Sequence, residues 1–195
     1  MSKRKWFAIF ALLAVCSMLV IACEDVEDAI NEKTQQTKSF DEELPFAIPL
    51  TSTDGYCTPM INFDDLLSSV SLWNDVKGHI DDVQIKGIYY TVDPNDNGSD
   101  GVINFYVTES EKDYFNGNGA PASSDKVGYT ATIVAGQKVK DQEMIFTASG
   151  QERLEELMID FEQPFRVCAE WGGSSDDVDM SVSLSVDVDV IFVPL

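Results

Sequence analysis

One segment of the sequence spaces oxygen-bearing side chains as a calcium-binding loop does. These side chains are Asp93, Asn95, Asn97 and Asp100, with Gly98 between the last two. Oxygen ligands at alternate positions can converge on a hard cation, and the glycine permits the sharp turn. The twelfth position, however, holds Asn104 where an EF-hand needs a bidentate acid, and long hairpin loops select the same residue types. The segment predicts either an ordinary loop or a single calcium site; we expect no other cofactor.

Two of the four cysteines, Cys57 and Cys168, lie in the body of the chain. In an oxidising compartment such an even pair predicts a disulfide. Closing a loop of about 110 residues would stabilise the fold by up to about 4–5 kcal/mol in the chain-entropy model. Two buried thiols are the alternative. A catalytic cysteine is disfavoured because it needs a nearby base, and His79 is the one histidine of the chain.

Other chemistry has little support in the sequence. His79 lies in the last turn of a predicted helix, where a lone histidine complements the helix dipole or lies at the surface. The sequence contains no G-x-S-x-G motif, phosphate-binding loop or dinucleotide fingerprint. The acidic group Asp176, Asp177 and Asp179 predicts a solvated loop, with cation binding as the alternative. We therefore expect no enzymatic activity, although a hydrolase with a carboxylate pair remains a third hypothesis because the separation of carboxylates is not visible in a sequence.

The N-terminus combines a basic head with an apolar run. Lys3, Arg4 and Lys5 precede 17 residues without charge. As a helix this run would be about 25 Å long, at the lower limit for spanning a bilayer and somewhat longer than the apolar part of a typical secretory signal. The length of this run is therefore compatible with a membrane span and with a secretory signal.

The residues that end this run, Val20-Ile21-Ala22-Cys23, resemble the lipobox of bacterial lipoprotein signal peptides. Val20 supplies the branched aliphatic residue and Ala22 the small residue before the cysteine, whereas Cys16 follows the bulky Val15. The resemblance covers residues 1–23 only. It implies that residues 1–22 are removed and that Cys23 carries the acyl chains, such as palmitate, that anchor the protein to the membrane. An uncleaved membrane span is the alternative, and both predict export of the acidic body.

The strongly acidic composition limits the partners. The net charge is −21, and removal of residues 1–22 takes away three basic residues and no acid, which gives −24. Such a chain repels nucleic-acid phosphates, so we expect no nucleic-acid binding. The expected partners are the membrane, through the lipid anchor, and an unidentified protein or glycan. The acids after Cys23 resemble those of some surface-exposed lipoproteins and favour the outer membrane or cell surface of the bacterial envelope.

Downstream of the anchor the hydropathy pattern predicts a stalk and a domain. Residues 23–43 are polar and acidic and predict a lipidated stalk, and residues 44–195 predict the domain. Strands are expected over 44–50, at a sheet edge because of Pro45 and Pro49, and over 83–92 and 101–110, which 93–100 would join as a hairpin. A second hairpin is expected from 126–136 and 142–148, and further strands over 164–171 and 180–195. Helices are expected over 61–80 and 152–161, the latter with a capping box from Ser149 to Glu152.

The last strand shows the clearest alternation. Apolar residues from Met180 to Phe192 alternate with Ser181, Ser183, Ser185, Asp187 and Asp189, which predicts one face in the core and one in water. Together these elements predict a mainly β fold, an antiparallel β-sandwich of about seven strands with two short inserted helices. The expected function is that of a lipid-anchored, non-catalytic binding or structural module of the envelope. The second hypothesis is a calcium-dependent carbohydrate- or protein-binding module.

Overall fold

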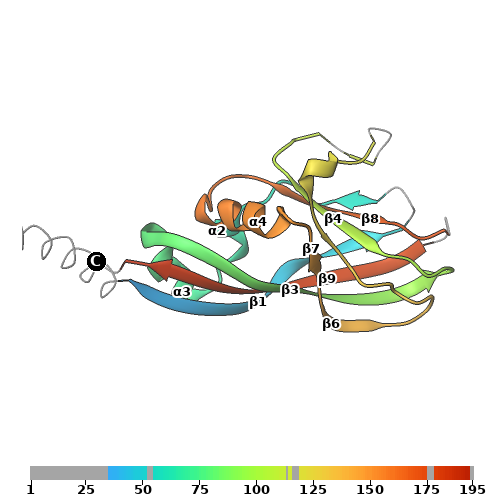
Figure 1. Ribbon diagram of the computed structural model, residues 1–195, viewed down its shortest axis with the longest axis horizontal. Helices are drawn as coiled ribbons and strands as arrows, with labels where there is room; N and C mark the ends of the chain where they lie inside the picture. The colour runs from blue at the N-terminus through green and yellow to red at the C-terminus, as the bar shows by residue number, and fades with distance from the viewer. Residues whose placement is uncertain (1–34, 52–54, 113, 116–118, 175–177, 194–195) are drawn as a thin grey trace, which may run out of the picture. The chain divides into compact units, whose positions relative to one another are not determined.

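The computed structural model describes residues 35–51, 55–112, 114–115, 119–174 and 178–193 (Figure 1). The predicted signal peptide, Cys16, Cys23 and the stalk up to residue 34 lie outside the described residues. Residues Thr37–Phe192 form one compact unit, and this unit is the domain considered below. Among the described residues, no helix has the length and apolar character needed to cross a membrane.

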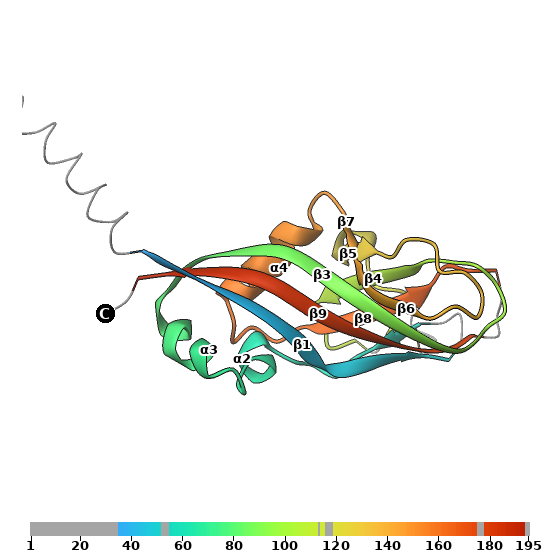
Figure 2. The ribbon, with the colours of Figure 1, turned by 90° about the horizontal axis from the view of Figure 1, so that it is seen from below.

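Two sheets make up the domain (Figures 1 and 2). The first sheet is four-stranded and has the order β1 (Gln36–Leu50), β9 (Val178–Phe192), β3 (Ile80–Asn97), β6 (Val139–Glu143). The second is five-stranded and has the order β2 (Tyr56–Cys57), β8 (Arg166–Trp171), β4 (Ile103–Thr108), β5 (Lys126–Tyr129), β7 (Ile145–Phe146). The pairings of β3 with its neighbours and those within the second sheet are antiparallel. The predicted antiparallel β-sandwich is confirmed; β2 and β7, each of two residues, are additional to the seven longer strands.

The core lies between the two sheets, and β9 contributes one complete face to it. Along β9 buried residues alternate with half-exposed ones from Met180 to Phe192, as the sequence predicts. Val182, Val188 and Val190 are fully buried, and they meet apolar residues of the second sheet, such as Phe105, in one hydrophobic cluster. This inward face fixes the register of β9, because a slip by one residue would place the serines and aspartates in the core.

The predicted hairpin between residues 83–92 and 101–110 is wrong. β3 does not turn at Asp93 but continues to Asn97, paired with β9 along its length. The chain then crosses to the second sheet, where β4 pairs with β5 and β8. The long apolar face shared by β3 and β9 outweighs the local turn signal. The second predicted hairpin, from 126–136 and 142–148, is correct in part, because β5 pairs with β7. Strand β6, however, belongs to the first sheet. The chain passes from the first sheet to the second at the buried Met144.

The predicted helix over 61–80 is broken into short pieces, α2 (Phe63–Leu66), α3 (Ser71–Val76) and the 3-10 turn η1 (Lys77–His79). Polar side chains compete for the backbone at the break. The Ser68 hydroxyl donates to the Asp65 carbonyl at 2.8 Å, and the Asn74 amide donates to the Ser68 carbonyl at 3.1 Å. These bonds satisfy carbonyl groups that a continuous helix would use.

The domain begins earlier than the sequence predicts, because β1 starts at Gln36 within the predicted stalk. Phe40 is buried and its ring meets that of Trp73 edge-on at a centroid distance of 6.4 Å. The Ser39 hydroxyl donates to Asp189 on β9 at 2.6 Å. The boundary at residue 43 is therefore wrong: residues 36–43 form part of the first strand. β1 lies at a sheet edge, as Pro45 and Pro49 predict.

Helix α4 (Gly150–Ile159) covers the part of the β3 edge that does not pair with β6. The Gln151 amide donates to the Ile85 carbonyl at 2.8 Å, and the Ile85 N–H donates to Glu155 at 2.8 Å. Side chains thus replace the neighbouring strand and cover an edge that another chain could pair with. The helix is predicted correctly, but Ser149 makes no side-chain capping bond, so the predicted capping box does not form.

The start of α4 depends on a glycine. A Cβ atom added to Gly150 would lie 1.9 Å from the Val127 carbonyl oxygen. We expect Gly150→Ala to lower the free energy of unfolding by about 1–3 kcal/mol, since helix and strand must move apart. Gly78→Ala is the matched control, because a Cβ there meets nothing within 4 Å. Equal urea midpoints for the two variants would contradict the importance of this close approach.

Candidate functional site

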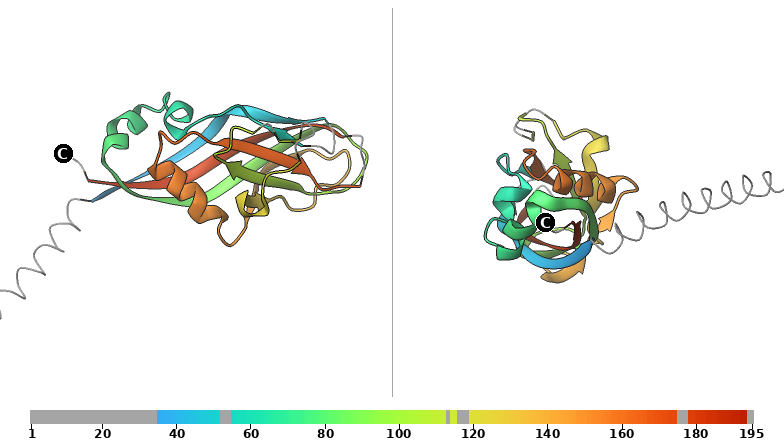
Figure 3. Two further views of the ribbon diagram at one scale, coloured as in Figure 1. Left: turned by 90° about the horizontal axis from the view of Figure 1, so that it is seen from above. Right: turned by 90° about the vertical axis from the view of Figure 1, so that its left-hand side faces the viewer.

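The outward-facing side of the four-stranded sheet is the candidate site. No described helix or loop lies across it: in Figure 2 helix α4 lies behind the sheet and helices α2 and α3 lie beside it, and Figure 3 shows the helices on other sides of the domain. Its central strands are β3 and β9, flanked by β1 and β6. We call the following residues the acidic face: Asp41, Glu43, Tyr89, Thr91, Asp93, Lys140, Asp141, Ser183, Ser185 and Asp187.

Two adjoining grooves cross the acidic face. One has a volume of about 320 Å³ and the other of about 400 Å³, and Tyr89, Asp141 and Ser185 line both. These volumes fall within the range of ligand pockets, which is about 300–1,000 Å³. By contrast, the apolar cavity inside the core measures about 40 Å³. It is too small for a ligand of ordinary size.

The strand pairing fixes Tyr89 at the centre of the acidic face. Tyr89 lies opposite Ser185 of β9 and Glu143 of β6, and its side chain is half-buried. The ring lies over Gly87: a Cβ added to Gly87 would meet ring atoms of Tyr89 at 3.1 Å. Gly87 therefore lets the ring lie close to the backbone.

A β-bulge sets the position of Asp141. Tyr90 pairs with Gln142 and Val92 with Val139, so β6 has one residue more than β3 between these pairs. Asp141 has a φ of 48°, which is uncommon for a residue other than glycine. Thr91 holds it there: its hydroxyl donates to the Asp141 carboxylate at 3.3 Å and accepts from the Asp141 N–H at 3.2 Å. The bulge thereby carries a carboxylate onto the groove wall.

Carboxylates outnumber cations on and around the acidic face. Lys138 pairs with Asp93, and Lys140 lies 3.6 Å from Asp141. Lys86 binds Asp189 at 2.8 Å beside the face. The hydrogen bonds from Lys86 and Ser39 lower the pKa of Asp189 below its ordinary value, so this carboxylate is charged at neutral pH. Asp41, Glu43 and Asp187 add further negative charge.

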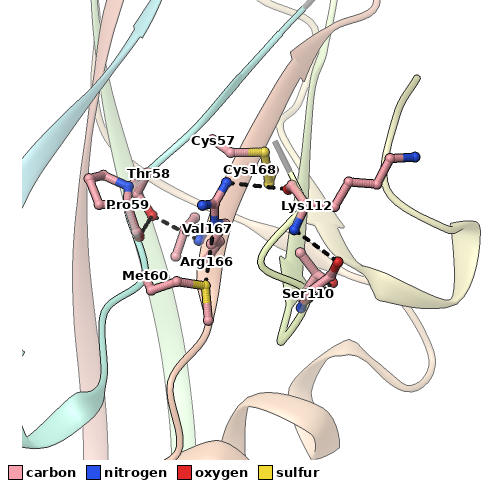
Figure 4. Close-up of a disulfide and its surroundings, with 10 residues drawn as sticks. Cys57, Thr58, Pro59, Met60, Ser110, Lys112, Arg166, Val167 and Cys168 are labelled. Carbon is pink, nitrogen blue, oxygen red and sulfur yellow. Dashed lines mark hydrogen bonds between the residues drawn. A yellow bond between two sulfur atoms is a disulfide. The ribbon is translucent and has the colours of Figure 1, made fainter. Parts of the chain in front are cut away.

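The outward side of the other sheet is covered instead. Tyr106 and Cys168 belong to β4 and β8 but lie outside the inter-sheet core, and both are nonetheless buried. The Tyr106 hydroxyl donates to Glu170 at 2.8 Å, and burial is the main reason why the pKa of Tyr106 is raised. The chain after β4 folds back here, where Arg166 donates to the Lys112 carbonyl at 3.3 Å (Figure 4). The two sheet faces therefore differ in access.

The predicted disulfide is present. Cys57 and Cys168 are bonded with an S–S distance of 2.04 Å and face each other across β2 and β8 (Figure 4). At the next register position the Thr58 N–H donates to the Val167 carbonyl at 2.9 Å. The cysteines therefore occupy a pair without hydrogen bonds of its own, where side chains of antiparallel strands approach most closely.

The predicted calcium ligands are not arranged as a loop. Asp93, Asn95 and Asn97 belong to β3, in which alternate residues are about 7 Å apart. Asp93 pairs with Lys138, and the Asp100 carboxylate accepts from the Ala135 N–H at 2.9 Å. Among the described residues, no group of three or more His, Cys, Asp or Glu side chains could hold a metal ion. The premise of a hairpin loop is wrong, and calcium binding stays a prediction without structural support.

His79 and Asp179 are not among the described residues that line the two grooves. His79 ends the turn η1 and is half-exposed. Asp176 and Asp177 lie outside the described residues, and Asp179 is exposed at the start of β9. The structure therefore does not bring these residues together with Asp93 or Tyr89 into one described site.

Comparisons with known proteins do not assign a family. No family model and no curated protein matches the chain. Among solved structures, the mud crab tombus-like virus is 9% identical with a TM-score of 0.41, the match covering 83% of this chain and 82% of that one. The virus-like particle of the prawn Macrobrachium rosenbergii nodavirus is 10% identical with a TM-score of 0.37, covering 83% and 96%. At these values the similarity carries no argument about function.

The acidic face itself is not predicted from the sequence. The outward serines and aspartates of β9 are visible in the sequence as a polar stripe. Tyr89 has no such signal, because alternation from Val83 and Ile85 would place it in the core, and the register shift between Ile85 and Gly87 turns it outward. The approach of β6 and the bulge at Asp141 have no comparable sequence signal.

Proposed function

We propose that this protein is an exported bacterial lipoprotein, anchored through Cys23, whose β-sandwich is a non-catalytic binding module of the cell envelope. The observation that carries the proposal is the disulfide between Cys57 and Cys168. Disulfides persist in oxidising compartments outside the cytosol, so the disulfide supports the export that the lipobox-like residues 20–23 imply. The two features are far apart in the chain and independent of each other.

The binding role is supported by the acidic face. It offers two grooves and a half-buried aromatic ring on an uncovered sheet. The groove walls carry hydroxyl, carboxylate and ammonium groups, without a histidine or cysteine among the described lining residues. Such an arrangement suits recognition through hydrogen bonds and charge more than nucleophilic or general-base chemistry.

The test is lipid attachment at Cys23. In a bacterial host given labelled palmitate, we expect the wild-type protein to incorporate the label and to fractionate with membranes. Cys23→Ala should lose the label entirely, because the thiol is the acylation site, while Cys16→Ala should keep it. Mass spectrometry of the purified protein should show a diacylglyceryl group on Cys23 as the first residue.

Two results would contradict the proposal. If Cys23→Ala still carries labelled palmitate, the acylated residue lies elsewhere. If the wild-type protein keeps residues 1–22 and carries no acyl chain, the N-terminus is an uncleaved segment and not a lipoprotein signal.

A further inference from the structure

We propose that the acidic face is a docking surface for a basic segment of a partner protein, with a lysine or arginine side chain placed over the ring of Tyr89. This inference rests on the proposed binding function and names the class of partner. It is argued from charge complementarity, from the position of the ring and from the acceptors around it.

Charge selects the class of partner. The grooves are lined by the carboxylates of Asp41, Glu43, Asp93, Asp141 and Asp187. Lys138 pairs with Asp93 and Lys140 with Asp141, so the carboxylates remain in excess. A second copy of this chain, with a net charge of −21, would be repelled. A neutral glycan could donate hydrogen bonds to the carboxylates, but it would not be attracted by their excess negative charge. A basic segment is attracted from a distance and then held in register by the same charges.

The ring of Tyr89 suits a cation. The face of an aromatic ring is electron-rich and attracts ammonium and guanidinium groups within about 6 Å of its centroid. Two lysines among the described residues make this contact within the domain: Lys112 lies 5.0 Å from the centroid of Tyr114, and Lys126 lies 5.1 Å from that of Tyr129. Tyr89 has no such cation among the described contacts, and its ring lies over Gly87 within both grooves.

Acceptors surround the ring at the positions that a guanidinium or ammonium group would reach. The carboxylate of Asp141 is carried to the groove by the bulge in β6, and Ser185 lies opposite Tyr89 on β9. Ser183 and Glu43 continue the wall toward β1. Hydrogen bonds from a charged donor to such carboxylates are stronger than bonds between neutral groups. The adjoining grooves extend beyond one side chain, which fits a segment of chain better than a free small cation.

The experiment uses the full acylated chain in a non-ionic detergent and an oligo-arginine peptide as the probe, with binding followed by calorimetry. We expect saturable binding that weakens strongly between about 50 and 500 mM NaCl. Tyr89→Leu should weaken binding about two- to fivefold, whereas Tyr89→Phe should keep it, because the ring and not the hydroxyl attracts the cation. The double variant Glu43→Gln/Asp141→Asn should weaken binding about three- to tenfold.

The matched control removes the same charge elsewhere. Glu152 and Glu162 are exposed and belong to neither groove, so Glu152→Gln/Glu162→Gln should change the affinity less than about twofold. Equal weakening by the two double variants would overturn the proposal, as would absence of peptide binding, or binding of a neutral glucan oligosaccharide that Tyr89→Leu abolishes. Each of these results leaves lipid attachment at Cys23 untouched, so failure of the docking surface and failure of the proposed anchoring are distinguishable.

Discussion

Removal of the Cys57–Cys168 disulfide should lower the free energy of unfolding by up to about 4–5 kcal/mol. The crosslink joins residues 111 positions apart, and without it the unfolded chain gains the entropy of that loop. The native state also loses a covalent link between β2 and β8, which pair at only two described register positions. The variant Cys57→Ala/Cys168→Ala should therefore fold but unfold at a much lower urea concentration.

The reduced wild-type protein is the control for this prediction. It keeps both sulfur atoms, so it separates the loss of the crosslink from the cavity that alanine leaves at the fully buried Cys168. We expect reduction alone to account for most of the loss, and hydrogen exchange to speed up first around Thr58. If the reduced and oxidised proteins unfold at the same urea concentration, the disulfide does not limit the entropy of the unfolded chain.

Trp73→Ala should lower the free energy of unfolding by about 3–5 kcal/mol, the usual range for deleting a large buried aromatic side chain. Trp73 is fully buried on α3 and meets the rings of Phe40 and Phe161 edge-on, at centroid distances of 6.4 and 5.7 Å. It thus joins the start of β1 to the segment after α4. Its loss should release residues of β1 that lie outside the sequence-predicted domain.

Trp73→Phe separates packing from hydrogen bonding. The indole N–H donates to the Asp64 carboxylate at 3.1 Å, and Lys77 binds the same oxygen at 2.6 Å. Phenylalanine keeps an aromatic ring but loses this donor. The loss of the hydrogen bond should lower the free energy of unfolding by about 1 kcal/mol, in addition to the effect of the smaller side-chain volume. Urea unfolding followed by circular dichroism measures both variants without relying on the replaced fluorophore. A cost as large for phenylalanine as for alanine would show that the ring contacts contribute little.

Much of the sandwich follows from the sequence because the features concerned are local or pairwise. The alternation from Met180 to Phe192 specifies a strand with one buried face, and the structure confirms it. Pro45 and Pro49 place β1 at an edge because proline has no N–H to donate. Cys57 and Cys168 have no other cysteine to pair with in the predicted domain. The lipid attachment of Cys23 rests on residues 20–23 alone and stays a prediction.

Tertiary structure alone decided which strands pair and what their outward sides carry. Asp93 to Asn97 have the composition of a turn, yet they extend β3 because pairing with β9 buries apolar surface that a local hairpin could not bury. Phe40 belongs to the core because its ring packs against the ring of Trp73. The acidic face exists because β1, β3, β6 and β9, distant in sequence, become neighbours. Alternation along residues 83–92 would place Tyr89 in the core with Val83 and Ile85; the register shift between Ile85 and Gly87 turns it outward. Only the approach of β6 brings Asp141 beside it. Long-range pairing depends on the burial available to the whole chain and not on local residue preference.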